Sequence, residues 1–317
     1  MSENYTNVLR KWLKNSDKED EEFFYKYRED LKDKIYKNDK IEEFMKYVNT
    51  HCPRRMRKCI YQEDILTAGA VCYIGGSLIL SNRNLNKKAL FLFSFLYMLV
   101  DYYVDKNEDH EQTKEFVKNI SKYLKTGKVS DNILYISNVY EEMIEETKDV
   151  RYVLESIKAE MESYKIQTDR SNEYSKIDYK NMASKKGGKT IEAIVSLNNN
   201  KTTPADYLLG QIIQYIDDIM DVEEDISLSI NTFVTKEYAE SGNIDEPWIH
   251  TVLLIDTIDS IYNALKPMML ATLIYAVNRY SHLYSSNLYR SVEPYLTDCK
   301  IEESIRTKFY HVLMDNI

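Results

Sequence analysis

The sequence predicts an all-α fold, and three observations support this prediction. Apolar residues recur mostly at helical spacing along the 317 residues. Gly and Pro, which interrupt helices, are scarce, with 8 and 5 residues respectively. Hydrophobic residues make up 44% of the chain, which is enough for a substantial core. An all-helical protein with one main domain is therefore expected.

The expected elements follow from the periodicity and from the breaks between periodic segments. We expect a polar N-terminal arm or first helix over residues 1–22, and one helical domain over residues 23–317, since no internal repeat or low-complexity linker divides it. Turns are expected at Thr126-Gly127, Asn198-Asn199-Asn200 and Ser241-Gly242-Asn243. The main helices are expected over residues 23–48, 87–109, 130–147, 149–168, 205–224 and from 248 onward.

Composition excludes several classes of function. The net charge of −9 argues against a general nucleic-acid-binding protein, which would carry a basic face. The stretch Ala89 to Val100 is uncharged but too short to span a membrane, so a buried core helix is expected there. The four cysteines form no CxxC pair and no signal peptide precedes them, which indicates reduced thiols in a cytoplasmic protein.

Two acidic clusters, about 116 residues apart, are the most informative feature of the chain. Asp101, Asp105 and Asp109 follow one apolar helical segment at intervals of four residues. Asp217, Asp221 and Asp225 follow another at the same intervals. This spacing places the carboxylates of each cluster on one helix face.

Apolar residues fill the gaps between these aspartates, where a solvated helix would carry lysine. The carboxylates are therefore expected to be half-buried, and a cation is the simplest compensation for them. Magnesium prefers oxygen ligands and bridges to phosphate groups. Either cluster alone is also typical of an exposed helix surface, but the two together predict a shared site for magnesium and a diphosphate. The residues between the aspartates are Tyr102, Tyr103, Val104, Ile219, Met220 and Val222.

Basic residues that could meet a diphosphate stand upstream of each acidic cluster. Arg54-Arg55-Met56-Arg57 supplies guanidinium groups suited to phosphate oxygens, although it could also be a surface patch. Lys189 follows Gly187-Gly188, where a helix break is expected to expose backbone N–H groups to an anion. No strand precedes these glycines, so a nucleotide-binding P-loop is excluded.

These motifs resemble those of the trans-isoprenyl diphosphate synthases, within the class I terpenoid synthase fold. Lys189-Thr190 resembles the KT pair of that family, and Arg54 to Arg57 resembles its GKRxRP segment. The order of the motifs agrees over roughly residues 50–225. The GxxxQxxDDxxD pattern of the family is matched by Gly210, Gln214, Asp217, Asp218 and Asp221.

The resemblance implies a single-domain helical bundle of the isoprenoid synthase type around a central active-site cavity, usually in a homodimer. It implies that Asp101 and Asp105 bind two Mg²⁺ ions and that Asp217 binds a third, with Asp218 and Asp221 beside it. Contacts to the two diphosphate substrates are implied for Lys189, Thr190, Gln214, Arg54, Arg55 and Arg57.

Three departures from the family pattern affect mainly the grip on diphosphate. Tyr102 replaces the second aspartate of the first motif, giving DxxxD. No arginine follows this motif between Lys106 and Gln112. The lysine expected after the second motif is replaced around Asn231, although Lys236 is close by and is the candidate in its place.

Three hypotheses for function follow. The leading one is condensation of an allylic prenyl diphosphate with isopentenyl diphosphate, head to tail, to a product of about C15 to C20. Tyr97, one turn before Asp101, is expected to limit the length of that product. The second is a terpene synthase, or an enzyme similar to squalene and phytoene synthases, that needs no isopentenyl diphosphate. The third is a non-catalytic regulatory subunit of a prenyl synthase.

Overall fold

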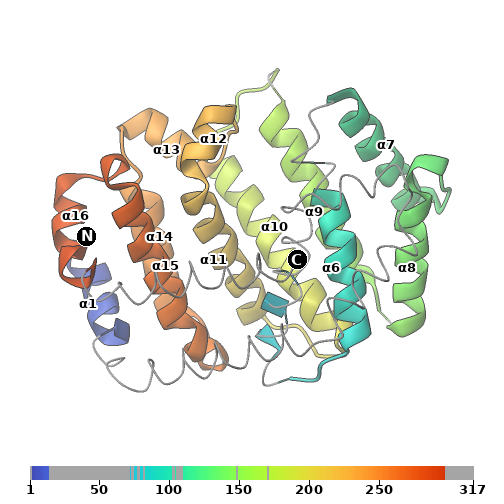
Figure 1. Cartoon of the computed structure of the whole chain (residues 1–317), viewed down its shortest axis with the longest axis horizontal. Coiled ribbons are helices and arrows are strands. Elements are labelled where there is room, and N and C mark those ends of the chain that lie inside the picture. The colour runs from blue at the N-terminus through green and yellow to red at the C-terminus, as the bar shows by residue number, and fades with distance from the viewer. Residues whose placement is uncertain are drawn as a thin grey trace, which may run out of the picture. The chain divides into compact units, whose positions relative to one another are not determined.

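The computed structural model describes residues 2–13, 72, 75–76, 79–80, 83–101, 104, 110–147, 149–169 and 171–296. Within these ranges the chain forms twelve α-helices and three short 3-10 helices, and no β-strand (Figure 1). The all-α prediction is therefore confirmed for the described residues. The expected helix over residues 23–48 lies outside them.

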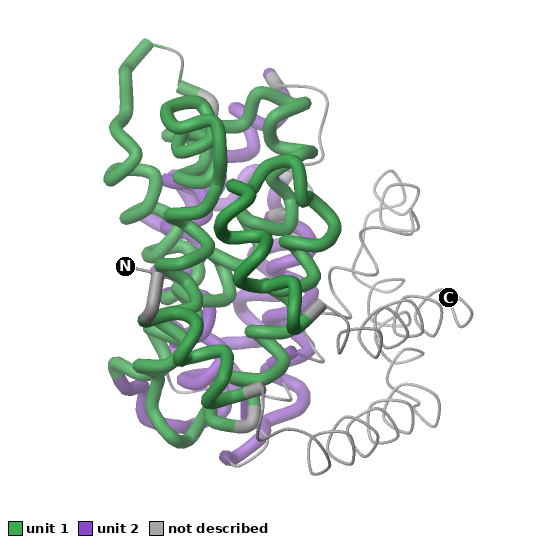
Figure 2. The backbone as a smooth tube through the Cα atoms, turned by 90° about the vertical axis from the view of Figure 1, so that its left-hand side faces the viewer, with its two compact units in different colours: residues 1–30, 165–188, 204–312 green, residues 31–164, 189–203, 313–317 purple. Residues whose placement is uncertain are grey.

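The described residues belong to two compact units, coloured separately in Figure 2. Unit 1 takes its described residues from 1–30, 165–188 and 204–312, and unit 2 from 31–164 and 189–203. The expected arrangement of an arm over 1–22 and a single domain over 23–317 stays a prediction.

Unit 2 contains the apolar helix α6, Lys87–Asp101, which packs against α8, Leu134–Glu146. Residues on all sides of α6 are buried, including Leu90, Leu92, Phe95 and Leu99, as expected for a helix that is apolar all round. The prediction of a buried core helix over Ala89 to Val100 is thus confirmed. This unit also contains α7, His110–Thr126, and η2, Asp131–Ile133, together with residues 151–164 of α9, Arg151–Thr168, and residues 189–197 of α10, Lys176–Leu197.

Unit 1 has its core between α11, α14 and α15, which contact one another. Trp248 of α14 is fully buried, and its indole Nε1 donates to the Leu273 carbonyl of α15 at 2.8 Å. Unit 1 also includes residues 176–188 of α10. The helices that lie entirely within this unit are α1, Ser2–Leu13, α11, Pro204–Met220, α12, Val222–Leu228, α13, Phe233–Ser241, α14, Asp245–Thr257, η3, Ser260–Leu265, α15, Lys266–Arg279, η4, Ser281–Leu283, and α16, Ser286–Leu296.

Helix α1 packs on α14 and α15. Its residues Tyr5 and Leu9 are buried, and the Tyr5 ring meets the Trp248 ring edge-on at 5.7 Å. The Lys266 ammonium of α15 lies 4.5 Å from the centre of the Trp12 ring, a cation–π contact. Residues 2–13 are therefore a docked helix of unit 1.

Helix α10 runs without interruption from Lys176 to Leu197. The expected break at Gly187-Gly188 is wrong, because these glycines serve packing. A Cβ added at Gly187 would lie 2.1 Å from the Gly210 carbonyl oxygen of α11, and one at Gly188 would lie 2.5 Å from the Tyr207 ring. The absence of side chains lets α10 and α11 approach to backbone contact.

The ends of several helices follow from local chemistry, as the sequence predicts. Gly127 and Gly242 adopt left-handed conformations, with φ of 66° and 76°, directly after α7 and α13. The Thr232 hydroxyl accepts from the Thr235 backbone N–H at the start of α13, and Thr235 bonds back in a capping box. The expected loop at Asn198–Asn200 follows the end of α10.

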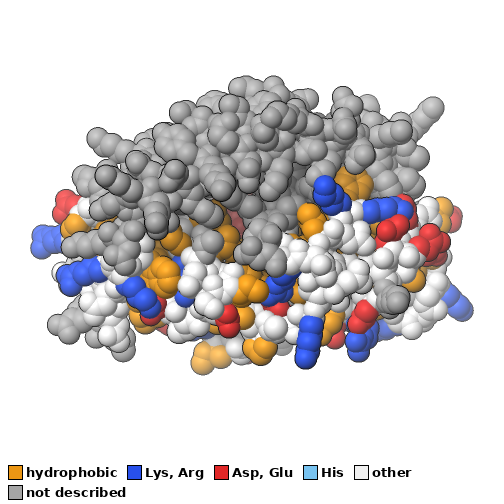
Figure 3. All heavy atoms as spheres, turned by 90° about the horizontal axis from the view of Figure 1, so that it is seen from below, with side chains coloured by type: hydrophobic (Ala, Val, Ile, Leu, Met, Phe, Trp, Pro, Cys, Tyr) orange, Lys and Arg blue, Asp and Glu red, His pale blue; other side chains and the backbone are white. Residues whose placement is uncertain are grey.

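No helix in the described part of the chain is both long and apolar enough to cross a lipid bilayer. On the face seen in Figure 3, the described basic and acidic side chains are interspersed, and neither charge forms a continuous patch.

Candidate functional site

The second acidic cluster lies where α11 ends and α12 begins, within unit 1. Asp217 and Asp218 occupy the last turn of α11, and Asp221 stands between the two helices. The Asp221 N–H donates to the Asp217 carbonyl and the Asp225 N–H to the Asp221 carbonyl, both at 2.9 Å. These two hydrogen bonds have helical spacing, although the backbone of Asp221 itself lies outside the helical region.

Asp218 is the buried member of the cluster, with 8% of its surface exposed. One of its carboxylate oxygens, Oδ2, is buried and has no hydrogen-bond partner among the described residues. Burial raises the pKa of Asp218, a hydrogen bond from Gln214 lowers it, and the charges of Asp217 and Asp221 raise it again, so that the net pKa is about 7. An unsatisfied buried carboxylate oxygen is costly and requires a reason, such as a ligand.

Asp225 extends the cluster by one turn. Burial, together with the nearby charges of Asp218, Asp221 and Asp217, raises its pKa to about 8. Its side chain is half-buried, whereas Asp217 and Asp221 are exposed. The cluster thus combines two exposed carboxylates with two that burial and repulsion make hard to ionise.

Two neighbouring residues partly offset this negative charge. The Gln214 side-chain amide donates to Asp217 at 3.2 Å and to Asp218 at 3.0 Å, so it orients both carboxylates. The positive charge of Lys186 on α10 lowers the pKa of Asp218, but less than burial raises it. Gln214 and Lys186 do not fully compensate the aspartates, so the junction remains electronegative and suited to a cation.

In the described part of the chain, no group of three or more His, Cys, Asp or Glu side chains converges closely enough to hold a metal ion. The donor types at the junction nevertheless fit magnesium, which prefers carboxylate oxygens and keeps several of its waters. Asp218 supplies an unsatisfied oxygen, and Asp217 and Asp221 are exposed on the same junction.

Lys189 and Thr190 lie in the middle of α10, on the part that belongs to unit 2. The Lys189 ammonium pairs with Glu155 of α9 at 2.7 Å and with Glu192 at 2.9 Å. Burial lowers the pKa of Lys189, but the two glutamates outweigh this and the net pKa is raised. Thr190 shares a hydrogen bond of 3.2 Å with Ser156.

The uninterrupted course of α10 changes one expectation about Lys189. Backbone N–H groups inside a helix are bonded to carbonyls four residues earlier, so residues 187–190 offer no free N–H groups to an anion. A diphosphate here would have to be bound by side chains, and the Lys189 ammonium would have to exchange its two glutamates for it.

The structure places two further predicted residues. The Lys236 ammonium of α13 lies 5.7 Å from the centre of the Tyr179 ring of α10, so it covers an aromatic face. Tyr97 of α6 is half-buried, and its ring lies 6.5 Å from that of Phe93, one turn earlier.

The remaining predicted residues lie outside what the structure describes. Arg54, Arg55, Arg57 and Asp105 are not among the described residues, and only the backbone of Asp101, the last residue of α6, is described. The pairing of the two acidic clusters across a cavity therefore stays a prediction.

Sequence reasoning assigned no role to Lys186, although Lys186 directly precedes the glycines that bring α10 against α11. It noted the spacing of Asp225 without assigning it a ligand role, and the repeated interval of four residues was the available signal. No family model, curated protein or solved structure matches this chain.

Proposed function

We propose that this chain is a magnesium-dependent enzyme acting on allylic prenyl diphosphates, and that it condenses them head to tail with isopentenyl diphosphate. The observation that carries the proposal is Asp218, a buried carboxylate with an unsatisfied oxygen at the centre of a GxxxQxxDDxxD pattern. Such a group favours a bound cation over a purely structural role, because a structural carboxylate would be paired.

Asp217, Asp218 and Asp221 would hold magnesium at the junction, with Asp225 behind them, and Asp101 and Asp105 would hold it at the first cluster. Three ions are expected. When bound, magnesium supplies Lewis acidity and neutralises the charge of the leaving diphosphate.

The chain's own residues bind and orient the substrates. Gln214 fixes the carboxylates of Asp217 and Asp218, and Lys189 provides a cation for the allylic diphosphate. Arg54, Arg55 and Arg57 would hold isopentenyl diphosphate. An apolar cavity, with Tyr97 limiting its depth, excludes water while the allylic C–O bond breaks and the alkene of the second substrate attacks the allylic carbon. The released diphosphate then accepts the proton.

A second candidate is a terpene synthase on the same scaffold, which ionises one prenyl diphosphate and cyclises it or adds water. The absence of arginine between Lys106 and Gln112 favours this candidate, because the family uses arginines there. The pairing of Lys189 with two glutamates likewise weakens the expected grip on diphosphate.

Product analysis tests the proposal. Purified protein is incubated with Mg²⁺ and geranyl, farnesyl or geranylgeranyl diphosphate, with and without isopentenyl diphosphate. Longer prenyl alcohols that require isopentenyl diphosphate and phosphatase treatment support the leading proposal. Hydrocarbons or alcohols released without either support the terpene synthase. The absence of any magnesium-dependent turnover contradicts both and favours a non-catalytic subunit.

Matched variants connect the turnover to the junction. Asp217→Asn and Asp218→Asn are each expected to reduce turnover at least a hundredfold, because neutral amides bind magnesium poorly. Asp259→Asn is the control, since Asp259 is an exposed N-cap residue of η3 and asparagine caps equally well. Normal turnover in both junction variants would contradict the assignment.

A further inference from the structure

The junction between α11 and α12 is a helix break without an obvious cause in the local sequence. Asp221 has φ −100° and ψ 6°, outside the helical region. Sharp helix kinks arise at Pro, at Gly or Ser, at π-bulges, or where a side chain inserts into the backbone ladder. Residues 217–225 contain no Pro, Gly or Ser.

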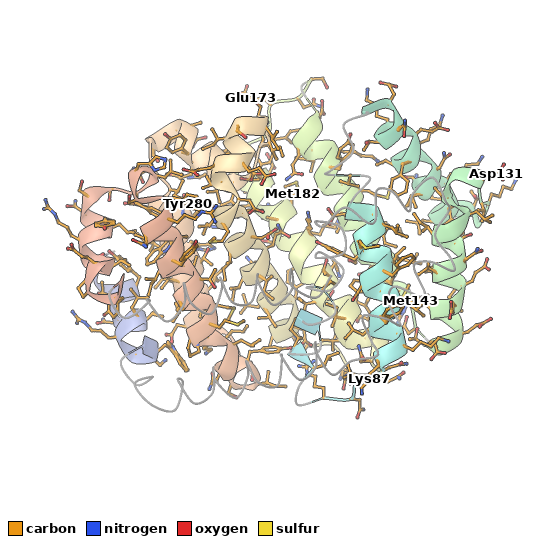
Figure 4. The ribbon with its side chains drawn as sticks, in the orientation of Figure 1. Lys87, Asp131, Met143, Glu173, Met182 and Tyr280 are labelled. Carbon is orange, nitrogen blue, oxygen red and sulfur yellow. The ribbon has the colours of Figure 1, made fainter. Side chains whose placement is uncertain are left out.

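A side chain from sixty residues further along the chain reaches the backbone at this break. The hydroxyl group of Tyr280 donates a hydrogen bond of 2.6 Å to the carbonyl of Met220, the last residue of α11. Met220 stands directly before Asp221 and two residues after Asp218. Tyr280, labelled in Figure 4, follows the end of α15.

Tyr280 is itself held firmly. Its side chain is only 3% exposed. Its N–H donates to the Ala276 carbonyl at 2.9 Å, and its carbonyl accepts from Leu283 at 2.8 Å. The Leu283 carbonyl in turn accepts from the Ile244 N–H at the start of α14, at 2.9 Å. These backbone hydrogen bonds and the burial of the ring hold Tyr280 in place, so its hydroxyl is positioned to bond the Met220 carbonyl.

The same segment also meets the far side of the break. His282 of η4 lies 3.2 Å from the Glu223 carboxylate of α12. Both side chains are largely exposed, so this pair adds little energy. Residues 280–282 therefore contact both sides of the break, the Met220 carbonyl before Asp221 and the Glu223 side chain after it.

We propose that Tyr280 is a positioning residue for the acidic junction. By bonding to the Met220 carbonyl, its hydroxyl fixes the break, and the break sets how Asp217, Asp218, Asp221 and Asp225 are presented to a cation. This inference rests on the proposed function, since it assumes that the junction binds magnesium.

A matched pair of tyrosines tests the inference. Tyr280→Phe removes the hydroxyl and keeps the buried ring. Tyr284→Phe does the same four residues later, where the tyrosine is also buried but its hydroxyl has no hydrogen-bond partner among the described residues. The two variants lose the same atom from the same segment, and only one loses the bond to the junction.

Two measurements are made without substrate. Mn²⁺ binding is followed by electron paramagnetic resonance, and amide hydrogen exchange over residues 217–225 is measured in metal-free protein. Tyr280→Phe is expected to weaken Mn²⁺ binding about tenfold, the usual effect of losing a group that orients ligands, and to speed exchange at the junction. Tyr284→Phe is expected to leave both unchanged.

The outcomes separate the inference from the proposed function. If the unaltered protein binds no Mn²⁺, the proposed function fails and the inference fails with it. If the unaltered protein binds Mn²⁺ and Tyr280→Phe binds it equally well, only the positioning role is overturned. If both variants weaken Mn²⁺ binding equally, the effect is a general loss of packing and the positioning role is again overturned.

Discussion

Gly187 of α10 and Gly210 of α11 lie in mutual backbone contact. A Cβ at either position would come within 2.1 Å of the other residue's carbonyl oxygen. Gly210 is also the first residue of the acidic motif, so this contact sets the approach of α10 to the helix that carries Asp217 and Asp218. Lys186, one residue before Gly187, thereby comes close enough to Asp218 to lower its pKa.

Gly187→Ala and Gly210→Ala are therefore expected to lower the free energy of unfolding by about 1–3 kcal/mol, because the added methyl group overpacks a backbone contact. Gly75→Ala is the control, since Gly75 is helical and a Cβ there would meet nothing within 4 Å. Alanine at position 75 is expected to stabilise by about 0.5–1 kcal/mol. Urea unfolding measures both effects, and equal stability of Gly187→Ala and the original protein would refute the contact.

Asp218→Asn is expected to make the metal-free protein more stable while abolishing its response to metal. The amide removes a buried carboxylate that lies close to two like charges. The midpoint of thermal unfolding at pH 7.5 should rise by about 2–4 °C without metal. Addition of Mg²⁺ and diphosphate should raise the midpoint of the original protein but not that of the variant. A variant that is less stable without metal would indicate a structural role for Asp218.

Lys189→Gln is expected to lower stability and to weaken substrate binding, whereas Glu155→Gln should lower stability without weakening substrate binding. Glutamine at position 189 leaves Glu192, which is 15% exposed, without its cation, at a cost of about 1 kcal/mol. If Lys189 also binds the diphosphate, the KM for the allylic substrate should rise about tenfold or more. Glu155→Gln removes a competitor for the ammonium, so KM should stay level or fall. A KM that rises equally in both variants would contradict this role.

His250 of α14 should make stability fall in mild acid. Burial lowers its pKa, the charge of Lys180 lowers it further, and Glu246 opposes the shift. The unfolded chain therefore takes up a proton that the folded protein refuses, and stability is lost as pH falls below about 6.5. His250→Gln should remove this loss, so the urea midpoint at about pH 5, relative to that at about pH 7, should be higher in the variant than in the original protein. An unchanged slope in His250→Gln would refute the assignment.

Tyr97→Ala is expected to lengthen the products if the protein elongates prenyl chains. Its half-buried ring, stacked near Phe93, would form the floor of the cavity, and removal of the ring opens about one more prenyl unit of depth. Mass spectrometry of the dephosphorylated products measures the shift. Leu134→Ala, a change at an exposed position of α8, is the control. The same product distribution in all three proteins would contradict the proposed floor.

The helical class and the main turns could be predicted because they depend on local signals. Helix α6 is buried on all sides, as its continuous apolar sequence requires, and the glycines after α7 and α13 adopt the left-handed conformation that ends a helix. The course of α10 could not be predicted in the same way. Gly187 and Gly188 resemble helix breakers until their partners on α11 are known, and those partners lie about twenty residues further on.

In the candidate site, too, features set by one helix could be predicted, and features set by contacts between distant segments could not. The spacing of the aspartates and the position of Gln214 follow from the sequence of one helix, so they could be identified without a structure. Glu192 is also visible in sequence as a neighbour of Lys189 on the same helix face, whereas Glu155 belongs to another helix. Tyr280 is one of 27 tyrosines in the chain and lies sixty residues from Met220, so nothing local distinguishes it.

The docking of α1 has a consequence for how the protein is made. The Trp12 indole donates to Asp256, 244 residues later, and Tyr5 bonds Ser291, 286 residues later. A ribosome adding about 5–20 residues per second needs roughly 12–50 s to reach Asp256 after Trp12. Helix α1 therefore waits for partners that are made long after it, and its contacts in unit 1 are complete only once Ser291 has been synthesised.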